Sequence, residues 1–188
     1  MDMYKVKWTR LQQRIFRILC IKAGQNFNLR GIAKLLNVSP TAIANSISEL
    51  EKEEVIKIEK SQTMNLTSIG FNRDSEEAIN FKRIENLKLI YESKIDKFFK
   101  SEFPGCTIIL FGSYSRGEDV FFGEKDDRNS DIDIAIIGTK GKNINLVKFE
   151  KVLEREIIIN FYKSWEEIHK NLKNNILNGI ILSGGVEL

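Results

Sequence analysis

In the first part of the chain, apolar residues recur every three or four positions and predict three successive helices, over residues 9–22, 29–36 and 41–52. The third helix has the clearest start, because Ser39 is a favourable N-cap and Pro40 suits the first helical position. Only a short turn separates it from the second helix. The pattern therefore predicts a small helical domain that contains a helix-turn-helix.

The pattern changes after the third helix. Residues 55–59 and 64–67 alternate between apolar and polar side chains, which predicts two strands joined by a turn at residues 61–63. A helix-turn-helix followed by a hairpin resembles the winged helix-turn-helix regulators, and we assign it to a first domain, residues 1–72. The resemblance implies that the third helix enters the major groove of double-stranded DNA.

Polar side chains on the outer side of the third helix are the candidates for base contacts. Asparagine can read adenine through two hydrogen bonds, and serine or threonine can contact several bases or phosphates. Cationic side chains near this helix would reach the DNA backbone. The candidate DNA-binding residues are Thr41, Asn45, Ser46, Arg30, Lys57 and Lys60.

Charge is distributed unevenly along the chain. Residues 1–72 carry eleven Lys and Arg against six Asp and Glu, whereas residues 73–188 carry eighteen against twenty. Positive charge concentrated in the first domain favours binding to phosphates. A winged helix used for protein contact or for dimerisation is the alternative, and a homodimer would also double the DNA contacts.

Residues 73–103 predict one long connecting helix. Asp74 or Ser75 can cap its start, apolar side chains recur along it at spacings of three and four, and Pro104 and Gly105 end it. Its broad apolar surface must pack against another element. The domain that follows and a second copy of the chain are the two candidates.

Two short apolar runs, residues 106–111 and 131–138, predict buried strands. Side chains alternate across a strand, so Asp131 and Asp133 share one face while the isoleucines beside them face a core. Two carboxylates on one face repel each other unless a cation lies between them. Magnesium accepts one or two carboxylates together with phosphate oxygens, so Asp131 and Asp133 are the candidate ligands for Mg²⁺ or Mn²⁺ and the candidate catalytic residues.

A Gly-Ser turn follows the first of these strands. Gly112 has no Cβ and lets a backbone N–H approach a phosphate, Ser113 offers a hydroxyl, and Arg116 can donate two hydrogen bonds to phosphate oxygens. Gly112-Ser113 followed by Asp131-x-Asp133 resembles the minimal nucleotidyltransferases of the DNA polymerase β-like superfamily. The resemblance spans residues 107–182.

This resemblance implies a further domain, residues 104–188, built as a mixed sheet with flanking helices. The whole chain is then expected to be an α+β protein with a winged helix, a long linker helix and a nucleotidyltransferase-like domain. The implied reaction transfers a nucleoside monophosphate from a nucleoside triphosphate, with ATP expected, to an acceptor hydroxyl. The acceptor would lie on a small molecule, a nucleic-acid end or a protein, in the last case a toxin-like partner as for antitoxins of this superfamily.

Two features depart from the family pattern. Residues 120–128 lengthen the connection between Ser113 and Asp131. They are expected to form a lid over the nucleotide, a partner contact or a solvated loop with two exposed phenylalanines. The family also places a third acid on a later strand. Here the strand over residues 156–162 puts Asn160 at that position, where its amide oxygen would be a weak metal ligand. Glu156 shares the same face of this strand but lies roughly 13 Å from Asn160.

These features are compatible with two functions. One is an enzyme that transfers nucleotides, and the other is a DNA-binding regulator whose transferase-like domain binds nucleotide or a partner without turnover. Apolar residues make up 42% and charged residues 29% of the chain, which suits a globular protein. We expect a cytoplasmic location without membrane attachment, because no apolar run is long enough to span a bilayer and Cys20 and Cys106 fall in predicted core elements.

Overall fold

The computed structural model describes residues 7–60, 67–123 and 126–186. The chain forms two compact units. The N-terminal unit comprises residues 1–82 together with residues 120–128, and the C-terminal unit comprises residues 83–119 and 129–188. No helix among the described residues is long and apolar enough to cross a membrane.

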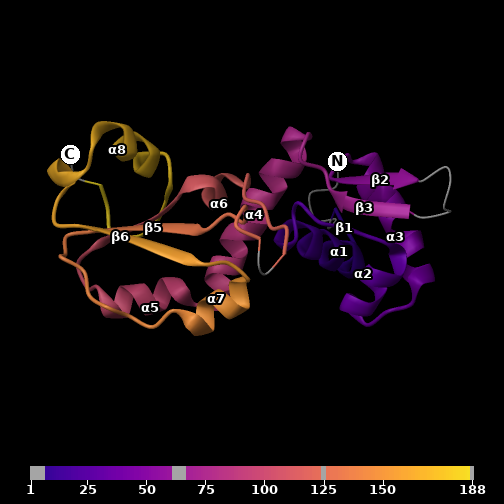
Figure 1. Ribbon diagram of the computed structural model, residues 1–188, viewed down its shortest axis with the longest axis horizontal. Helices are drawn as coiled ribbons and strands as arrows, with labels where there is room; N and C mark the ends of the chain where they lie inside the picture. Colours follow the sequence, from indigo (N-terminus) through magenta and orange to yellow (C-terminus); the bar gives the residue numbers. More distant parts are fainter. Residues whose placement is uncertain (1–6, 61–66, 124–125, 187–188) are drawn as a thin grey trace. The chain divides into compact units, whose positions relative to one another are not determined.

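The N-terminal unit has the element order of a winged helix (Figure 1). Three helices pack with an antiparallel sheet of three strands in the order β1-β3-β2. The three predicted helices are confirmed, with small differences at their ends. The elements are α1 (Arg10–Ile21), β1 (Asn26–Phe27), α2 (Leu29–Leu36), α3 (Pro40–Lys52), β2 (Ile56–Lys60) and β3 (Thr67–Phe71).

Local capping explains why these helices start where they do. The Thr9 hydroxyl accepts a hydrogen bond from the Gln12 N–H, and the Gln12 side chain accepts one from the Thr9 N–H, which completes a capping box. The Ser39 hydroxyl accepts from the Ala42 N–H at 3.1 Å, with Pro40 in the first turn as predicted. Each start is therefore encoded within a few residues of sequence.

The strands of this unit agree less well with the sequence analysis. The strand predicted over residues 64–67 and its turn at 61–63 lie outside the described residues, apart from Thr67. The observed partner of β2 is β3, which begins at Thr67 and ends at Phe71. The short strand β1 was not predicted, because two residues are too few to show an alternating pattern.

The predicted long helix over residues 73–103 is two helices, α4 (Glu76–Ser93) and α5 (Ile95–Glu102). Lys94 separates them with a left-handed backbone conformation, φ +64°. The Ser93 hydroxyl donates to the Ile90 carbonyl at 2.7 Å and accepts from the Ile95 N–H. This local bonding competes with the helical hydrogen bonds and ends α4.

The C-terminal unit is a mixed four-stranded sheet in the order β6-β5-β4-β7. β4 is antiparallel to β5 and β7, and β5 is parallel to β6. The strands predicted over residues 106–111, 131–138 and 156–162 are confirmed, with small differences at their ends. The elements after α5 are β4 (Thr107–Phe111), α6 (Gly112–Arg116), β5 (Ile132–Ile137), α7 (Val147–Leu153), β6 (Ile157–Tyr162), η1 (Trp165–Glu167), α8 (Lys170–Leu177) and β7 (Ile180–Ser183).

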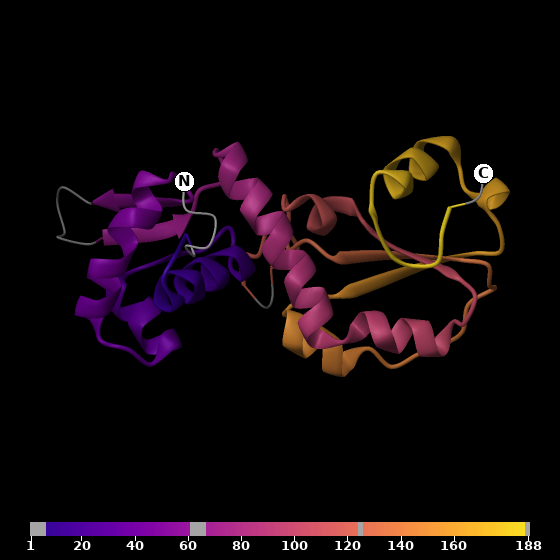
Figure 2. The same ribbon diagram turned by 180° about the vertical axis from the view of Figure 1, so that it is seen from behind.

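Helices cover both faces of this sheet (Figure 2). One face packs against α5 and α7 through a core that includes Ile108, Ile134 and Phe99. The other face packs against η1 and α8 through a smaller core that includes Phe111, Trp165 and Ile176. Asp133 of β5 and Asp131 just before it belong to the second face, because their neighbours Ile132 and Ile134 are fully buried in the first core.

Residues 120–128, which we call the inserted segment, belong to the N-terminal unit although they lie between α6 and β5 in sequence. The Phe121 N–H donates to the Ala23 carbonyl, and the Lys22 ammonium lies 4.3 Å from the centre of the Phe121 ring. The Gln25 side chain donates to the Phe122 carbonyl at 2.7 Å. Phe121 is only 5% exposed, so the expectation of a solvated loop with two exposed phenylalanines is wrong.

Replacing Phe121 with alanine is expected to lower the free energy of unfolding of the N-terminal unit by about 3 kcal/mol, because a buried aromatic ring is lost. Urea unfolding would be followed by the fluorescence of Trp8 in a Trp165→Phe background. The chain has two tryptophans, and Trp8 is the one in this unit. Leu35→Ala is the control, since Leu35 is exposed on α2 and its loss should change little. If the Phe121→Ala protein unfolded at the same urea concentration as its parent, the Phe121 ring would not stabilise the N-terminal unit by packing.

Candidate active site

The turn from β4 into α6 lies directly against an acidic side chain of β5. Phe111 at the end of β4 pairs with Asp133, so the next residue, Gly112, begins α6 beside that carboxylate. Gly112 has φ +75°, and a Cβ at this position would collide with the Asp133 carboxylate. Glycine is therefore required for the chain to turn this close to the acid.

Asp131 and Asp133 stand at the start of β5 and are both half-buried. The pKa of Asp133 is raised above its ordinary value, first by burial and then by the negative charge of Asp131, while Arg116 opposes the rise. The two carboxylates therefore repel each other, as the sequence analysis expected. A divalent cation would relieve this repulsion, so the residues present suit a magnesium ion that also contacts phosphate oxygens.

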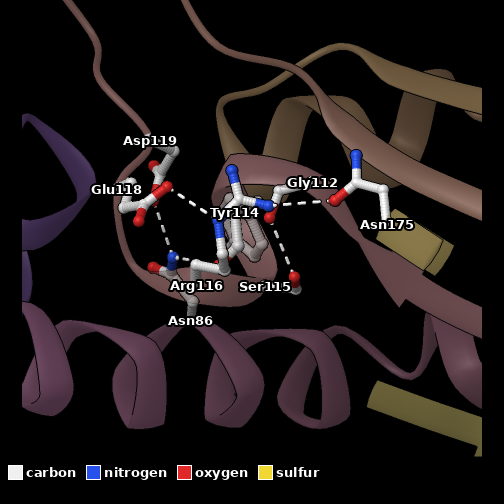
Figure 3. Close-up of polar contacts among 8 residues, drawn as sticks. All are labelled: Asn86, Gly112, Tyr114, Ser115, Arg116, Glu118, Asp119 and Asn175. Carbon is white, nitrogen blue, oxygen red and sulfur yellow. Dashed lines mark hydrogen bonds and ion pairs between the residues drawn. The ribbon is translucent and has the colours of Figure 1, made fainter. Parts of the chain in front are cut away.

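Arg116 at the end of α6 is held by two side chains (Figure 3). Its Nε donates to Glu118 Oε2 at 2.7 Å, and its Nη1 donates to Asn175 Oδ1 of α8 at 3.2 Å. The Arg116 side chain is exposed, and its positive charge acts on Asp133. Arg116 thus lies within electrostatic reach of the carboxylates, where the sequence analysis expected a phosphate contact.

The register of β5 with β6 fixes what stands beside the two acids. Ile158 pairs with Asp133, and Asn160 pairs with Ala135, one step farther along the same face. Ile158 is 36% exposed. Glu156 directly precedes β6, and its carbonyl accepts from the Ile132 N–H. The position beside Asp133 is therefore apolar, and in the described ranges no group of three or more His, Cys, Asp and Glu residues has the arrangement of a metal site.

A family model described as a nucleotidyltransferase domain matches residues 92–183. Most of the C-terminal unit is thus similar to a nucleotidyltransferase domain. The match begins at the end of α4, ahead of the domain start expected at residue 104, and it includes the whole four-stranded sheet. The resemblance that rested on Gly112-Ser113 and Asp131-x-Asp133 is thereby confirmed for the fold. No curated protein is significantly similar to the chain.

Solved structures similar to the chain include winged-helix regulators. The adhesin competence repressor AdcR of Streptococcus pyogenes is 20% identical, with a TM-score of 0.41 over 54% of this chain and 71% of that one. The zinc-responsive MarR family member ZitR of Lactococcus lactis is 22% identical, with a TM-score of 0.37 over 54% and 70%. A mutant of MepR from S. aureus is 18% identical, with a TM-score of 0.38 over 50% and 64%. Similarity this low carries no functional inference, and the winged-helix assignment rests on the element order of the N-terminal unit.

Three buried residues of the C-terminal unit were not predicted from the sequence. The Asn86 amide of α4 donates to the Tyr114 carbonyl in α6 at 2.9 Å and to Asp119 Oδ1 at 2.7 Å (Figure 3). Arg155, just before β6, donates from Nη2 to Asp119 Oδ2 at 3.0 Å. Asn86 had no distinct signal, because the charged residues Lys82, Arg83 and Glu85 precede it on the helix. The partners of Asp119 come from distant parts of the sequence and had no local signature.

The candidate DNA-binding residues have different surroundings. Thr41 and Asn45 are exposed on α3, and Arg30 is exposed on α2. The Ser46 hydroxyl donates to the Ala42 carbonyl at 2.8 Å and is thus engaged within the helix. Lys57 forms ion pairs with Glu59 and Asp74, which offset its charge. Lys60 ends β2, and its side chain falls outside the described part of the structure.

Replacing Asp133 with asparagine is expected to raise the free energy of unfolding of the C-terminal unit at pH 7 without divalent ions. The raised pKa means that the folded state holds the Asp133 proton more tightly than the unfolded chain does. The ionised carboxylate is therefore unfavourable at neutral pH. The advantage of the variant should shrink as the pH falls through that pKa, because wild-type Asp133 becomes protonated.

Trp165 fluorescence in a Trp8→Phe background would follow urea unfolding across this pH range. Glu166→Gln is a control of opposite sign, because a hydrogen bond from Ser164 lowers the pKa of Glu166. That variant should lose stability at neutral pH and match wild type in acid. An Asp133→Asn protein that is less stable than wild type at pH 7 would contradict the repulsion.

Proposed function

We propose that the protein is a magnesium-dependent nucleotidyltransferase that moves a nucleoside monophosphate from a nucleoside triphosphate, with ATP expected, to an acceptor hydroxyl. The observation that carries this proposal is the contact of Gly112 with the Asp133 carboxylate, within a domain of this family. The candidate phosphate-binding turn and the candidate metal ligands, which are separate in sequence, therefore lie together where β4 ends and β5 begins.

In this proposal each residue has a distinct role. Asp131 and Asp133 would hold the metal, which would supply charge neutralisation and activation of the attacking oxygen. The Ser113 hydroxyl and the first N–H groups of α6, which lack intrahelical partners, bind phosphate oxygens. Arg116 binds a phosphate with the donors that Glu118 and Asn175 leave available. The acceptor oxygen bonds to the α-phosphorus, the bond to pyrophosphate breaks, and the hydroxyl proton passes to solvent or a nearby base.

A second candidate function is favoured by Ile158. Because an isoleucine stands beside Asp133, no acid of β6 is placed to complete a second metal site or to accept the proton of the hydroxyl. Asn160, one step away beside Ala135, offers only a neutral amide oxygen. The alternative function is therefore a regulator that binds nucleotide at the same site without turnover, and whose winged helix binds DNA.

Calorimetry should show binding of ATP with magnesium to wild type and its loss in the Asp131→Ala and Asp133→Ala variants, because both metal ligands are required. Glu166→Gln is the control, because it removes an exposed carboxylate of the same unit and keeps Asp131 and Asp133. Equal binding by wild type and both alanine variants would remove the site from the proposal.

A transfer assay on the same proteins distinguishes an enzyme from a regulator. With α-labelled ATP and candidate protein, nucleic-acid and small-molecule acceptors, the enzyme incorporates label into one of them. A wild-type protein that binds ATP but transfers nothing, together with an Ile158→Asp variant that does transfer, would support the regulator.

We also propose that the winged helix binds double-stranded DNA, with Thr41 and Asn45 on α3 facing the bases and Arg30 on α2 near the phosphates. The support is their exposure and the excess of positive charge in residues 1–72. Binding would be modest for one chain, because α3 presents few cations. A second copy of the chain would supply a second set of contacts.

Fluorescence anisotropy with DNA fragments should show binding that weakens as salt is added. Arg30→Ala should lower the slope of log affinity against log salt by about 1, and Asn45→Ala should change sequence preference more than the slope. Lys97→Ala removes an exposed charge in the C-terminal unit and is the matched control. Binding that is insensitive to salt, or that falls equally with Lys97→Ala, would contradict the proposal.

A further inference from the structure

The helix that carries the candidate phosphate-binding turn is too short to hold its own position. α6 has five residues, no side chain caps its N-terminus, and Gly117 ends it in a left-handed conformation. Isolated helices of this length are unstable in water, so tertiary contacts must fix its place. Within α6, the Ser115 hydroxyl donates to the Gly112 carbonyl at 2.8 Å, which braces the turn but does not anchor it to the domain.

The anchor is the buried polar group formed by Asn86, Asp119 and Arg155. The Asn86 amide reaches the Tyr114 carbonyl, which lies in the last turn of α6, and also bonds Asp119 just beyond that turn. Arg155 bonds the second oxygen of the Asp119 carboxylate. Three separate stretches of the C-terminal unit, namely α4, the segment after α6 and the segment before β6, therefore meet at one carboxylate.

A buried ion pair such as that of Asp119 and Arg155 contributes little net stability to a core. The Asp119 and Arg155 side chains are each only 1% exposed. Removing two charges from water costs so much that an apolar replacement of similar volume is often as stable or more stable. An ion pair in this position is better explained by the geometry that it imposes. Both oxygens of Asp119 are used, and each fixes a different element.

We propose that Asn86, Asp119 and Arg155 are positioning residues for the triphosphate. They do not touch the nucleotide, but they hold α6 so that the backbone of Gly112 and Ser113 faces the carboxylates of β5. Arg155 also fixes the start of β6, the strand that pairs with β5 beside Asp133. This role rests on the proposed nucleotide site.

The test compares two ligands of the same site. Mn²⁺ alone needs only the carboxylates of β5, whereas ATP with magnesium also needs α6. Asn86→Ala should therefore bind Mn²⁺ alone, measured by electron paramagnetic resonance, as wild type does. Its affinity for ATP with magnesium, measured by calorimetry, should fall roughly 10- to 100-fold, the effect of a small misplacement of binding groups. A purely structural role would lower the melting temperature without separating the two affinities.

Leu153→Ala is the matched control, because Leu153 is buried in the same unit on α7 and contributes to stability by packing. It should lower the melting temperature and leave the ATP affinity of the folded protein unchanged. Should Asn86→Ala fail to fold, Arg155→Lys keeps the buried charge but loses the forked geometry, and it should show the same split between ATP and Mn²⁺ to a smaller degree.

Wild-type ATP affinity in folded Asn86→Ala or Arg155→Lys, or equal losses of ATP and Mn²⁺ binding, would overturn the positioning role while leaving the nucleotide site intact. Failure of the wild-type protein to bind ATP would instead overturn the proposed function, and the positioning role with it.

Discussion

The site depends on one constraint, the antiparallel register that pairs Phe111 of β4 with Asp133 of β5. This pairing brings the end of one strand against the acidic start of the next and forces the chain to turn at a glycine. The proposed binding of a triphosphate and its metal would need both the Gly-Ser turn and the acidic pair. A shift of one residue in this register would move the carboxylates to the opposite face, into the core that holds Ile132 and Ile134.

The electrostatics follow from the same register. Asp131 and Asp133 are kept close and partly shielded from water, with Arg116 as the counter-charge that acts on Asp133. The apolar cores on both faces of the sheet stabilise the domain despite the repulsion between the acids. Ile134, Ile136 and Ala135 are fully buried in these cores. Packing elsewhere in the domain thus offsets the repulsion between the acids, as is common where a site must receive a charged ligand.

Much of the fold could be predicted from sequence because its signals are local. Ser39 and Pro40 mark the start of α3 on their own, and the isoleucines of residues 132–137 mark a buried strand by their spacing. Most of the failures involve partners that lie far apart in sequence. The offset between β5 and β6 places Ile158 beside Asp133, and Asp119 finds its partners on α4 and before β6. Periodicity says which side of an element is buried, but it says nothing about what lies opposite.

The inserted segment restricts which fragments of this protein can fold independently. Because residues 120–128 fold with the N-terminal unit while interrupting the nucleotidyltransferase domain, the chain passes between the two units three times, at residues 82, 119 and 128. A fragment that begins near residue 92 would carry Phe121 and Phe122 without their partners Lys22, Ala23 and Gln25, and a fragment that ends at residue 82 would lose the same contacts from the other side. No single cut yields two complete folding units. A recombination event that exchanged only one of the two domains would therefore leave the other with part of its core uncovered.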